Sequence, residues 1–276
     1  MEGFDAFAPR EIARRVEEAG VAKARLALLP LVMLGMLAGA FVALGSLYYV
    51  IVASDPALPH ALQRVLGGLV FSLGLFLVVV AGAELFTGNN LIAMAWADGR
   101  VSTRELLRNW TVVCAANFAG AALIAALAYW SGHAEAYAAT YLKIAAAKTA
   151  LAPSEAFLRG VLCNVLVCLA VWMALAGRSV ADKLLAVAFP VSAFVAAGFE
   201  HSIANMFFLP LAMLLQAGAG LPVDASGLWR NLPVVIAGNI AGGSVLVALV
   251  YYVIYVRGAP ASAASSSRTA AGSGSE

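Results

Sequence analysis

Apolar runs near the length of a bilayer span recur along this chain, and they constrain its fold more than any other feature. They cover residues 26–52, 65–81, 111–130, 157–176, 184–197 and 232–256. A helix needs about 20 apolar residues to cross the hydrocarbon core. With 63% apolar and 12% charged residues, the composition is far from that of a soluble domain. The sequence therefore predicts an all-α membrane protein with six transmembrane helices.

The positive charges predict the orientation of these spans. Lys and Arg are retained on the cytoplasmic side of a bacterial inner membrane. If both termini are cytoplasmic, twelve of the 17 basic residues lie there: Arg10, Arg14, Arg15, Lys23, Arg25, Arg100, Arg104, Arg108, Arg178, Lys183, Arg257 and Arg268. The other five are Arg64, Lys143, Lys148, Arg159 and Arg230. We therefore expect a multi-pass inner-membrane protein with cytoplasmic termini.

Composition divides the chain into three parts: residues 1–25, 26–257 and 258–276. The first mixes apolar side chains with charges, and Pro9 and Gly20 suit the start and end of a short helix. Such an amphipathic helix is either a simple surface anchor or a movable cover over a pore mouth. The middle part is the transmembrane domain. The last part is rich in Ala, Ser and Gly and is expected to be disordered.

Two long apolar stretches, residues 66–97 and 184–216, carry polar residues at mid-length and share a pattern. Residues 82–89 read GAELFTGN and residues 198–205 read GFEHSIAN, which align as G-x-E-x-x-x-(G/A)-N. Asn109, Asn117 and Gly120 recur with equal spacing as Asn231, Asn239 and Gly242. Each half would hold three spans, so the second copy would enter the membrane in the opposite sense. The pattern predicts a 3+3 inverted repeat with two broken helices, and chance similarity is the alternative.

Broken helices in matching positions of two halves indicate a binding site at the membrane midplane. Their half-helix N-termini can offer free N–H groups to an anion. His201 is the one histidine inside an apolar segment, and an imidazole can donate a proton or neutralise an anion. The alternative is a core imidazole bonded to a carbonyl. Thr87 could donate a hydrogen bond from the opposite wall, while Glu84 and Glu200 suit a structural role as acceptors of N–H groups.

These motifs resemble the formate/nitrite transporter family. The resemblance runs from about residue 4 to 257, and its specific pieces are residues 82–89, LCNVLVCLAVWMA at 162–174 and GFEHSIANM at 198–206. It implies an aquaporin-like fold and a homopentamer with one pore per subunit. It implies no cofactor.

The resemblance also implies roles for individual residues. His201 would be the central pore histidine, Thr87 the threonine facing it, and Lys148 a vestibule lysine that attracts anions. A solvated Lys148 is the alternative. Asn164 and Asn205 would line the pathway, or would only bond neighbouring helices. Six apolar side chains would form constrictions: Leu85, Phe86, Phe71, Leu75, Val167 and Phe194.

The function that follows is a channel or transporter for small weak-acid anions, with formate favoured and nitrite or hydrosulfide of the same family as alternatives. Passive conduction and transport coupled to protons through His201 are the two alternative mechanisms. Water and glycerol channels of similar architecture carry an Asn-Pro-Ala pair at their broken helices. This sequence has no such pair, which makes conduction of neutral solutes less favoured. Cys114, Cys163 and Cys168 lie in apolar runs and suit packing, so no metal site is expected. The rival hypothesis is a membrane-embedded enzyme that uses His201 and Glu200 as acid and base, but the sequence has no H-E-x-x-H metal helix, no G-x-S-x-G elbow and no phosphate-binding loop.

Overall fold

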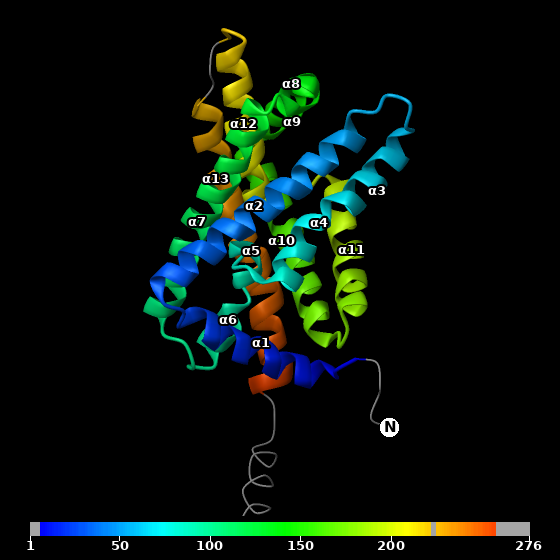
Figure 1. Cartoon of the computed structure of the whole chain (residues 1–276). Helices are drawn as coiled ribbons and strands as arrows, with labels where there is room; N and C mark the ends of the chain where they lie inside the picture. The colour runs from blue at the N-terminus through cyan, green and yellow to red at the C-terminus, as the bar shows by residue number, and fades with distance from the viewer. Residues whose placement is uncertain (1–5, 222–224, 258–276) are drawn as a thin grey trace, which may run out of the picture.

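The computed structural model, which describes residues 6–221 and 225–257, is all-helical across these ranges. Six helical stretches are long and apolar enough to cross a membrane: Leu28–Ala53, His60–Gly82, Thr103–Trp130, Pro153–Ala176, Val180–Ala197 and Ala225–Arg257. The prediction of six spans is confirmed. They stand side by side as one bundle (Figure 1). The tail at 258–276, which the sequence predicts to be disordered, and Phe4 lie outside the described residues.

Two of the spans are assembled from consecutive helical pieces. The span His60–Gly82 comprises α3 (His60–Phe71), α4 (Leu73–Phe76) and the π-helical stretch η1 (Leu77–Gly82). The span Ala225–Arg257 comprises α13 (Ala225–Ile240), η2 (Ala241–Leu249), α14 (Val250–Tyr252) and η3 (Val253–Arg257). The other four are single helices: α2 (Leu28–Ala53), α7 (Thr103–Trp130), α10 (Pro153–Ala176) and α11 (Val180–Ala197).

The helical path is interrupted twice near the middle of the bundle. After Gly82 (φ 87°) the backbone is extended at Ala83 and Leu85, and α5 (Phe86–Asn89) and α6 (Ile92–Ala97) follow. After Gly198 (φ 74°) the chain leaves α11, and α12 (Ser202–Gly218) begins beyond His201. Positive φ angles are strained for any residue with a Cβ, so glycine suits both turns. These interruptions bring the two GxE motifs into the core.

Glycines allow the spans to approach closely. A Cβ on Gly39 would overlap the Asn117 backbone, and one on Gly120 would overlap the Met36 backbone, so α2 and α7 touch through their main chains. Gly238 meets the Phe157 backbone in the same way and joins α10 to α13. Small residues at helix crossings are typical of membrane bundles, where van der Waals packing replaces the hydrophobic driving force.

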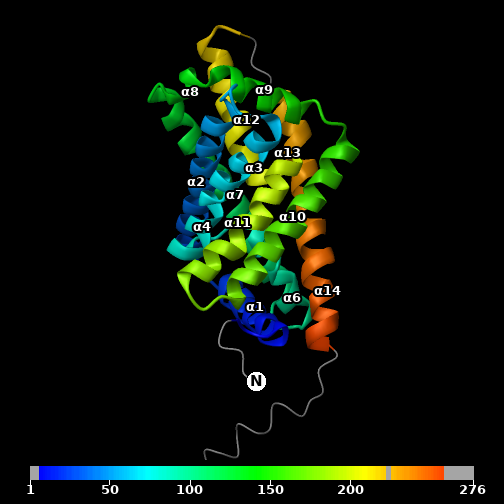
Figure 2. The same ribbon diagram turned by 90° about the vertical axis from the view of Figure 1, so that its right-hand side faces the viewer.

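Helix α1 (Pro9–Ala24) lies across the end of the bundle at which the described chain begins, next to α6 and η3 (Figure 2). It starts at Pro9, as the sequence predicts, but the predicted end at Gly20 is wrong. The helix continues to Ala24 because Gly20 packs inside the contact with α6, where its Cβ position lies 3.4 Å from Ala95 Cβ. The opposite end of the bundle carries α8 (His133–Ala136) and α9 (Ala138–Thr149).

Candidate functional site

Two buried carboxylates organise the interior, one at each interruption. The first is Glu84, whose Oε1 accepts from Lys23 Nζ at 2.6 Å and whose Oε2 accepts from Asn89 Nδ2 at 2.7 Å. Asn89 Nδ2 also donates to Asn109 Oδ1 at 3.0 Å, and Asn109 Nδ2 donates to the Lys23 carbonyl at 3.1 Å. The carboxylate charge is therefore compensated by an ammonium group and held in place by amides.

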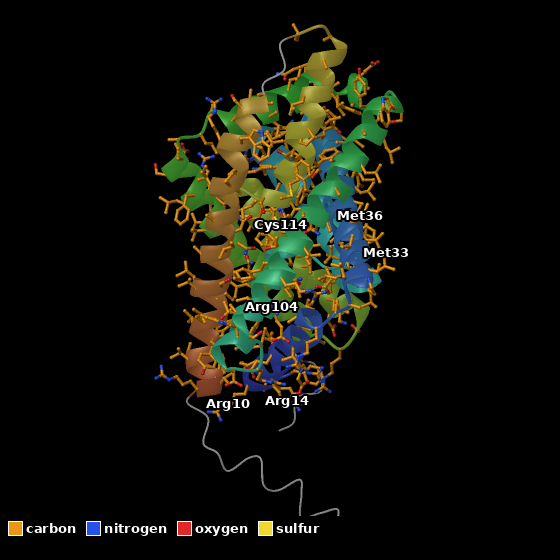
Figure 3. The ribbon with its side chains drawn as sticks, turned by 90° about the vertical axis from the view of Figure 1, so that its left-hand side faces the viewer. Arg10, Arg14, Met33, Met36, Arg104 and Cys114 are labelled. Carbon is orange, nitrogen blue, oxygen red and sulfur yellow. The ribbon has the colours of Figure 1, made fainter. Side chains whose placement is uncertain are left out.

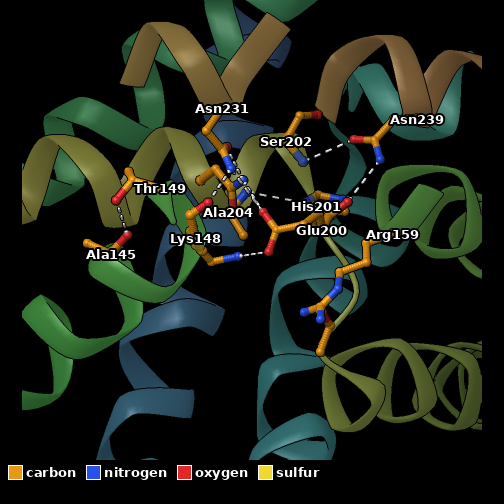
Figure 4. Close-up of polar contacts among 12 residues, drawn as sticks. Ala145, Lys148, Thr149, Arg159, Glu200, His201, Ser202, Ala204, Asn231 and Asn239 are labelled. Carbon is orange, nitrogen blue, oxygen red and sulfur yellow. Dashed lines mark hydrogen bonds and ion pairs between the residues drawn. The ribbon is translucent and has the colours of Figure 1, made fainter. Parts of the chain in front are cut away.

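The second carboxylate, Glu200, has the same set of partners at the other interruption. Its Oε1 accepts from Lys148 Nζ at 2.9 Å, and its Oε2 accepts from Asn205 Nδ2 at 2.7 Å (Figure 4). Asn205 Nδ2 donates to Asn231 Oδ1 at 2.7 Å, and Asn231 Nδ2 donates to the Lys148 carbonyl at 3.0 Å. Each bond repeats one around Glu84, so the two halves of the chain build one motif twice.

A second pair of asparagines holds the start of each half-helix. Asn117 Oδ1 accepts from Phe86 N at 2.9 Å, and Asn239 Oδ1 accepts from Ser202 N at 3.0 Å. Their Nδ2 groups donate to the carbonyls of Glu84 and Glu200, at 2.9 and 3.0 Å. The expectation of free N–H groups at the half-helix ends is therefore wrong for Phe86 and Ser202, because buried amides satisfy them.

His201 and Thr87 meet between the two interruptions. Thr87 Oγ1 lies 3.1 Å from His201 Nε2, and both residues are buried. His201 Nδ1 accepts from Ala204 N at 3.2 Å and so caps α12. An acceptor at Nδ1 requires the proton on Nε2, so the neutral ring points its N–H at the threonine hydroxyl. The ring also stacks on Phe194, with centroids 5.8 Å apart.

A cavity reaches toward this contact from each end of the bundle. The N-proximal cavity, on the side of α1, has a volume of 460 Å³ and is lined by Lys23, Glu84, Leu75, Leu85 and Lys183, among others. The N-distal cavity, on the side of α9, has a volume of 200 Å³ and is lined by His201, Lys148, Glu200, Phe71 and Phe194, among others. Among the described lining residues, each cavity has more cations than carboxylates, a field that favours anions.

The structure brings together most of the residues that the sequence singles out. Leu75 and Leu85 line one cavity, and Phe71 and Phe194 line the other. Phe86 instead lines a groove on the side of the bundle between α7 and α13, and Val167 is buried in the core. Cys114, Cys163 and Cys168 are free cysteines.

The two other asparagines of interest, Asn164 and Asn205, are fully buried and bond neighbouring elements. Asn164 Nδ2 lies 3.2 Å from the Thr87 carbonyl and 2.7 Å from both Asn90 Oδ1 and the Asn239 carbonyl. Asn205 joins Glu200 to Asn231. These contacts favour the alternative in which the asparagines hold the helices together. Glu84 and Glu200 do accept N–H groups, but from side chains of lysine and asparagine.

Sequence reasoning missed the role of Lys23, and it gave no role to Lys183, Arg64 or Arg159, which also line the cavities. The signal for Lys23 existed in part, because the repeat already paired Asn109 with Asn231. Those asparagines bond the carbonyls of Lys23 and Lys148, so a search for a basic partner in each half would have found both lysines.

A membrane bundle with a cationic cavity on each side of a buried histidine and threonine has the features expected of a channel or transporter for small anions. The family model for the formate/nitrite transporter matches residues 10–253. The chain belongs to this family. Its members and the relatives below are channels and transporters, so the chain is not an enzyme.

Relatives in sequence and structure agree with this assignment. The formate channel FocA of Escherichia coli (strain K12) is 39% identical over 274 residues, which cover 92% of this chain and 96% of FocA. A probable formate transporter of Methanothermobacter thermautotrophicus is 36% identical, covering 90% of this chain and 97% of that protein.

Two solved structures are similar as well. A pentameric formate channel with formate bound has a TM-score of 0.76 at 35% identity and covers 84% of this chain and 98% of its own. An ion channel of the FNT family has a TM-score of 0.80 at 28% identity, with coverages of 88% and 98%.

Proposed function

We propose that this protein conducts formate across the bacterial inner membrane, with nitrite and hydrosulfide as the alternative substrates. The observation that carries the proposal is the buried contact between His201 and Thr87, which lies between two cationic cavities that approach it from opposite ends of the bundle. Formate is the substrate named for FocA and for the pentameric channel with formate bound. For formate to pass, the 3.1 Å contact between Thr87 Oγ1 and His201 Nε2 must open, and each group then bonds the substrate in place of the other.

The barrier to such transport is desolvation. Moving a carboxylate-sized ion into a low-dielectric interior costs on the order of 20 kcal/mol in the idealised limit, and the apolar side chains Phe71, Phe194, Leu75 and Leu85 create such an interior. The neutral acid avoids most of this cost. Lys148 and Lys23 concentrate the anion in the two cavities. Before it crosses, the anion takes a proton from a hydronium ion of the cavity water and leaves a neutral water molecule, and the acid releases the proton to water on the other side.

In this proposal His201 acts as a hydrogen-bond donor. Its Nδ1 lone pair is used by the Ala204 N–H, so loss of the Nε2 proton would leave an imidazolate in the membrane interior. The Nε2–H instead donates to a substrate oxygen, and the Thr87 hydroxyl supports it from the facing wall. The substrate thus exchanges hydrogen bonds with water for two with the protein, which lowers the barrier without net charge transfer to the ring.

We further propose that the duplicated Lys–Glu–Asn–Asn clusters mark a 3+3 inverted repeat with two broken helices, in an aquaporin-like arrangement. The repeated hydrogen bonds and the matching motifs support it. By analogy with the pentameric relative, we propose a homopentamer with one pore per subunit. The termini would be cytoplasmic, so the N-distal cavity would open to the outside.

The test is anion flux into proteoliposomes across an imposed pH gradient, with formate, nitrite, hydrosulfide, chloride and glycerol compared. We expect weak-acid anions to pass faster as the outside becomes more acidic. His201→Phe should reduce formate flux by about tenfold or more, since each 1.36 kcal/mol of lost hydrogen bonding is a factor of ten in rate. His60→Phe, at an exposed position, is the control. Equal flux in both variants, or flux of glycerol alone, would reject the proposal.

A further inference from the structure

Two arginines line the N-distal cavity from different spans, and each bonds a backbone carbonyl at the end of α11. Arg64 extends from α3 and donates from Nε to the Ala196 carbonyl at 2.7 Å. Arg159 extends from α10 and donates from Nη1 to the Gly198 carbonyl at 3.4 Å. Both line the cavity together with Lys148 and Glu200. In the view of Figure 4, Glu200 lies between Lys148 and Arg159.

The hydrogen bonds to the end of α11 use only some of the N–H donors of the two guanidinium groups. An arginine has five N–H donors. Among the described residues, Arg64 donates through Nε alone, so the donors on Nη1 and Nη2 remain for a ligand. Arg159 donates from Nη2 to Glu155, which lies four residues earlier on the same helix face. The hydrogen bonds to Ala196, Gly198 and Glu155 therefore hold both guanidinium groups in place. They leave N–H donors unused, most of them on Arg64.

The charges around these groups favour an anion. The described residues that line the cavity include three cations, Arg64, Lys148 and Arg159, and one carboxylate, Glu200. That carboxylate already pairs with Lys148 at 2.9 Å. Arg159 pairs with Glu155, which is outside the described cavity lining, whereas Arg64 has no carboxylate partner among the described residues, so Arg64 is the cation of this cavity left for an anion.

We propose that Arg64 and Arg159 form a capture site for small planar oxyanions at the N-distal cavity, occupied before the anion reaches Lys148 and His201. This inference rests on the proposed function, since it assigns the first binding step to one side of the same pathway. The ligand class follows from the planar guanidinium fork, which matches the two oxygens of a carboxylate or of nitrite. A spherical anion such as chloride offers the fork a single acceptor atom, so it binds there without the two parallel hydrogen bonds that a planar oxyanion makes.

A purely structural role makes a different prediction. If the arginines only cap the end of α11, a lysine at position 64 would satisfy the Ala196 carbonyl equally well, and the concentration dependence of transport would not change. The two roles are therefore separated by Arg64→Lys, which keeps the charge and one donor group but loses the fork. Arg159→Gln removes the second cation. Lys143→Gln, at an exposed position on the adjacent α9, removes one positive charge outside the cavity and is the matched control.

The experiment measures the initial rate of formate transport in right-side-out and inside-out membrane vesicles, each with formate on one side only. Arg64→Lys and Arg159→Gln should raise the half-saturating concentration by about threefold or more when formate is supplied from the N-distal side. Supply from the N-proximal side should leave it unchanged, and Lys143→Gln should match wild type in both. Unchanged half-saturation in both variants, or an equal change from both sides, would overturn the inference.

A second measurement does not depend on transport. Formate should raise the melting temperature of the purified wild type and of Lys143→Gln more than chloride does at equal ionic strength, and this difference should shrink in Arg64→Lys. If wild-type vesicles carry no formate but the difference in melting temperature is present and sensitive to Arg64, the proposed function fails while the binding site stands. If wild type transports formate and the arginine variants behave as wild type in both measurements, the site fails alone.

Discussion

Asn117 is a single buried amide that holds three backbone groups at the first interruption. It accepts from Phe86 N and donates to the carbonyls of Gly35 and Glu84. Asn117→Ala would leave these groups without a partner away from water, at about 1–3 kcal/mol for each unsatisfied group. We expect a clear drop in the melting temperature of the purified protein, and a similar drop for Asn239→Ala at the second interruption.

The control for this prediction is Gln63→Ala. Gln63 also donates to two carbonyls, those of Ala53 and Asp55, but it lies on a partly exposed loop-facing surface where water can replace it. The expected loss of stability is about 1 kcal/mol or less. Equal losses for Asn117→Ala and Gln63→Ala would show that burial of the amide does not matter.

At the residue scale, the sequence predicts which groups are unusual better than which groups they touch. His201 and Glu200 stand out because ionisable groups are rare in apolar segments. Lys23 does not stand out, because it lies in a polar leader where lysine is ordinary. Its importance depends on α1 folding back onto the first interruption, a contact between residues 61 positions apart. No local sequence pattern predicts a contact between residues so far apart in the chain.

At the element scale, the six spans were predictable because the length of each apolar stretch is near that needed to cross a bilayer. The residues at which the helices begin and end were harder to predict. Helix α7 starts at Thr103, eight residues before the start of the apolar run at residues 111–130 that predicts it. Ser102 and Glu105 form a capping box that stabilises two further polar turns. Ser179 and Asp182 do the same before α11. The hydropathy of the sequence predicts the apolar part of a helix that lies in the membrane, but not the polar turns that extend it.

Helix α1 packs against the bundle, and its Glu17 carboxyl has a raised pKa. The carboxyl of Glu17 is buried, and burial raises its pKa to about 7. Repulsion from Asp98 adds to the shift, Arg100 opposes it, and Glu18 raises it slightly. Because the docked pKa lies above the ordinary value of 4.5, the docked helix holds a proton that the undocked helix would release. Docking should therefore weaken as pH rises from about 4.5 to 7 and be weakest above 7.

Hydrogen exchange of residues 9–24, corrected for intrinsic rates, would measure this dependence. We expect α1 to be better protected at pH 5 than at pH 8 in wild type. Glu17→Gln should show the higher protection at both pH values, because the amide imitates the protonated carboxyl. Glu18→Gln, on the exposed side of α1, removes only the smallest of the named contributions to the shift and should keep most of the pH dependence. If the Glu17 variant keeps the full pH dependence, another group controls the attachment.

At the scale of the whole molecule, basic residues gather at one end. Arg10 and Arg14 lie at the end that carries α1, and Arg104 lies in the same half of the bundle (Figure 3). Lys23 and Lys183 line the cavity at this end, and Arg178 lies over the ring of Phe7. At the opposite end, Arg64, Lys148 and Arg159 line the N-distal cavity, Lys143 lies on α9, and Arg230 lies near the start of α13. Because basic segments near a span stay in the cytoplasm, this asymmetry predicts that both termini are cytoplasmic and that the arginine capture site faces outward.

Reporter fusions test this orientation in living cells. A fluorescent protein that matures only in the cytoplasm should fluoresce when fused after Glu276, while alkaline phosphatase, which is active only outside, should be inactive there. The pattern should reverse for fusions after Ala150, which follows α9 at the other end of the bundle. Phosphatase activity at Glu276 would invert the assignment of the two cavities. The half-saturation effect of Arg64→Lys would then appear for formate supplied from the cytoplasm, so the two experiments together fix both the site and the side it serves.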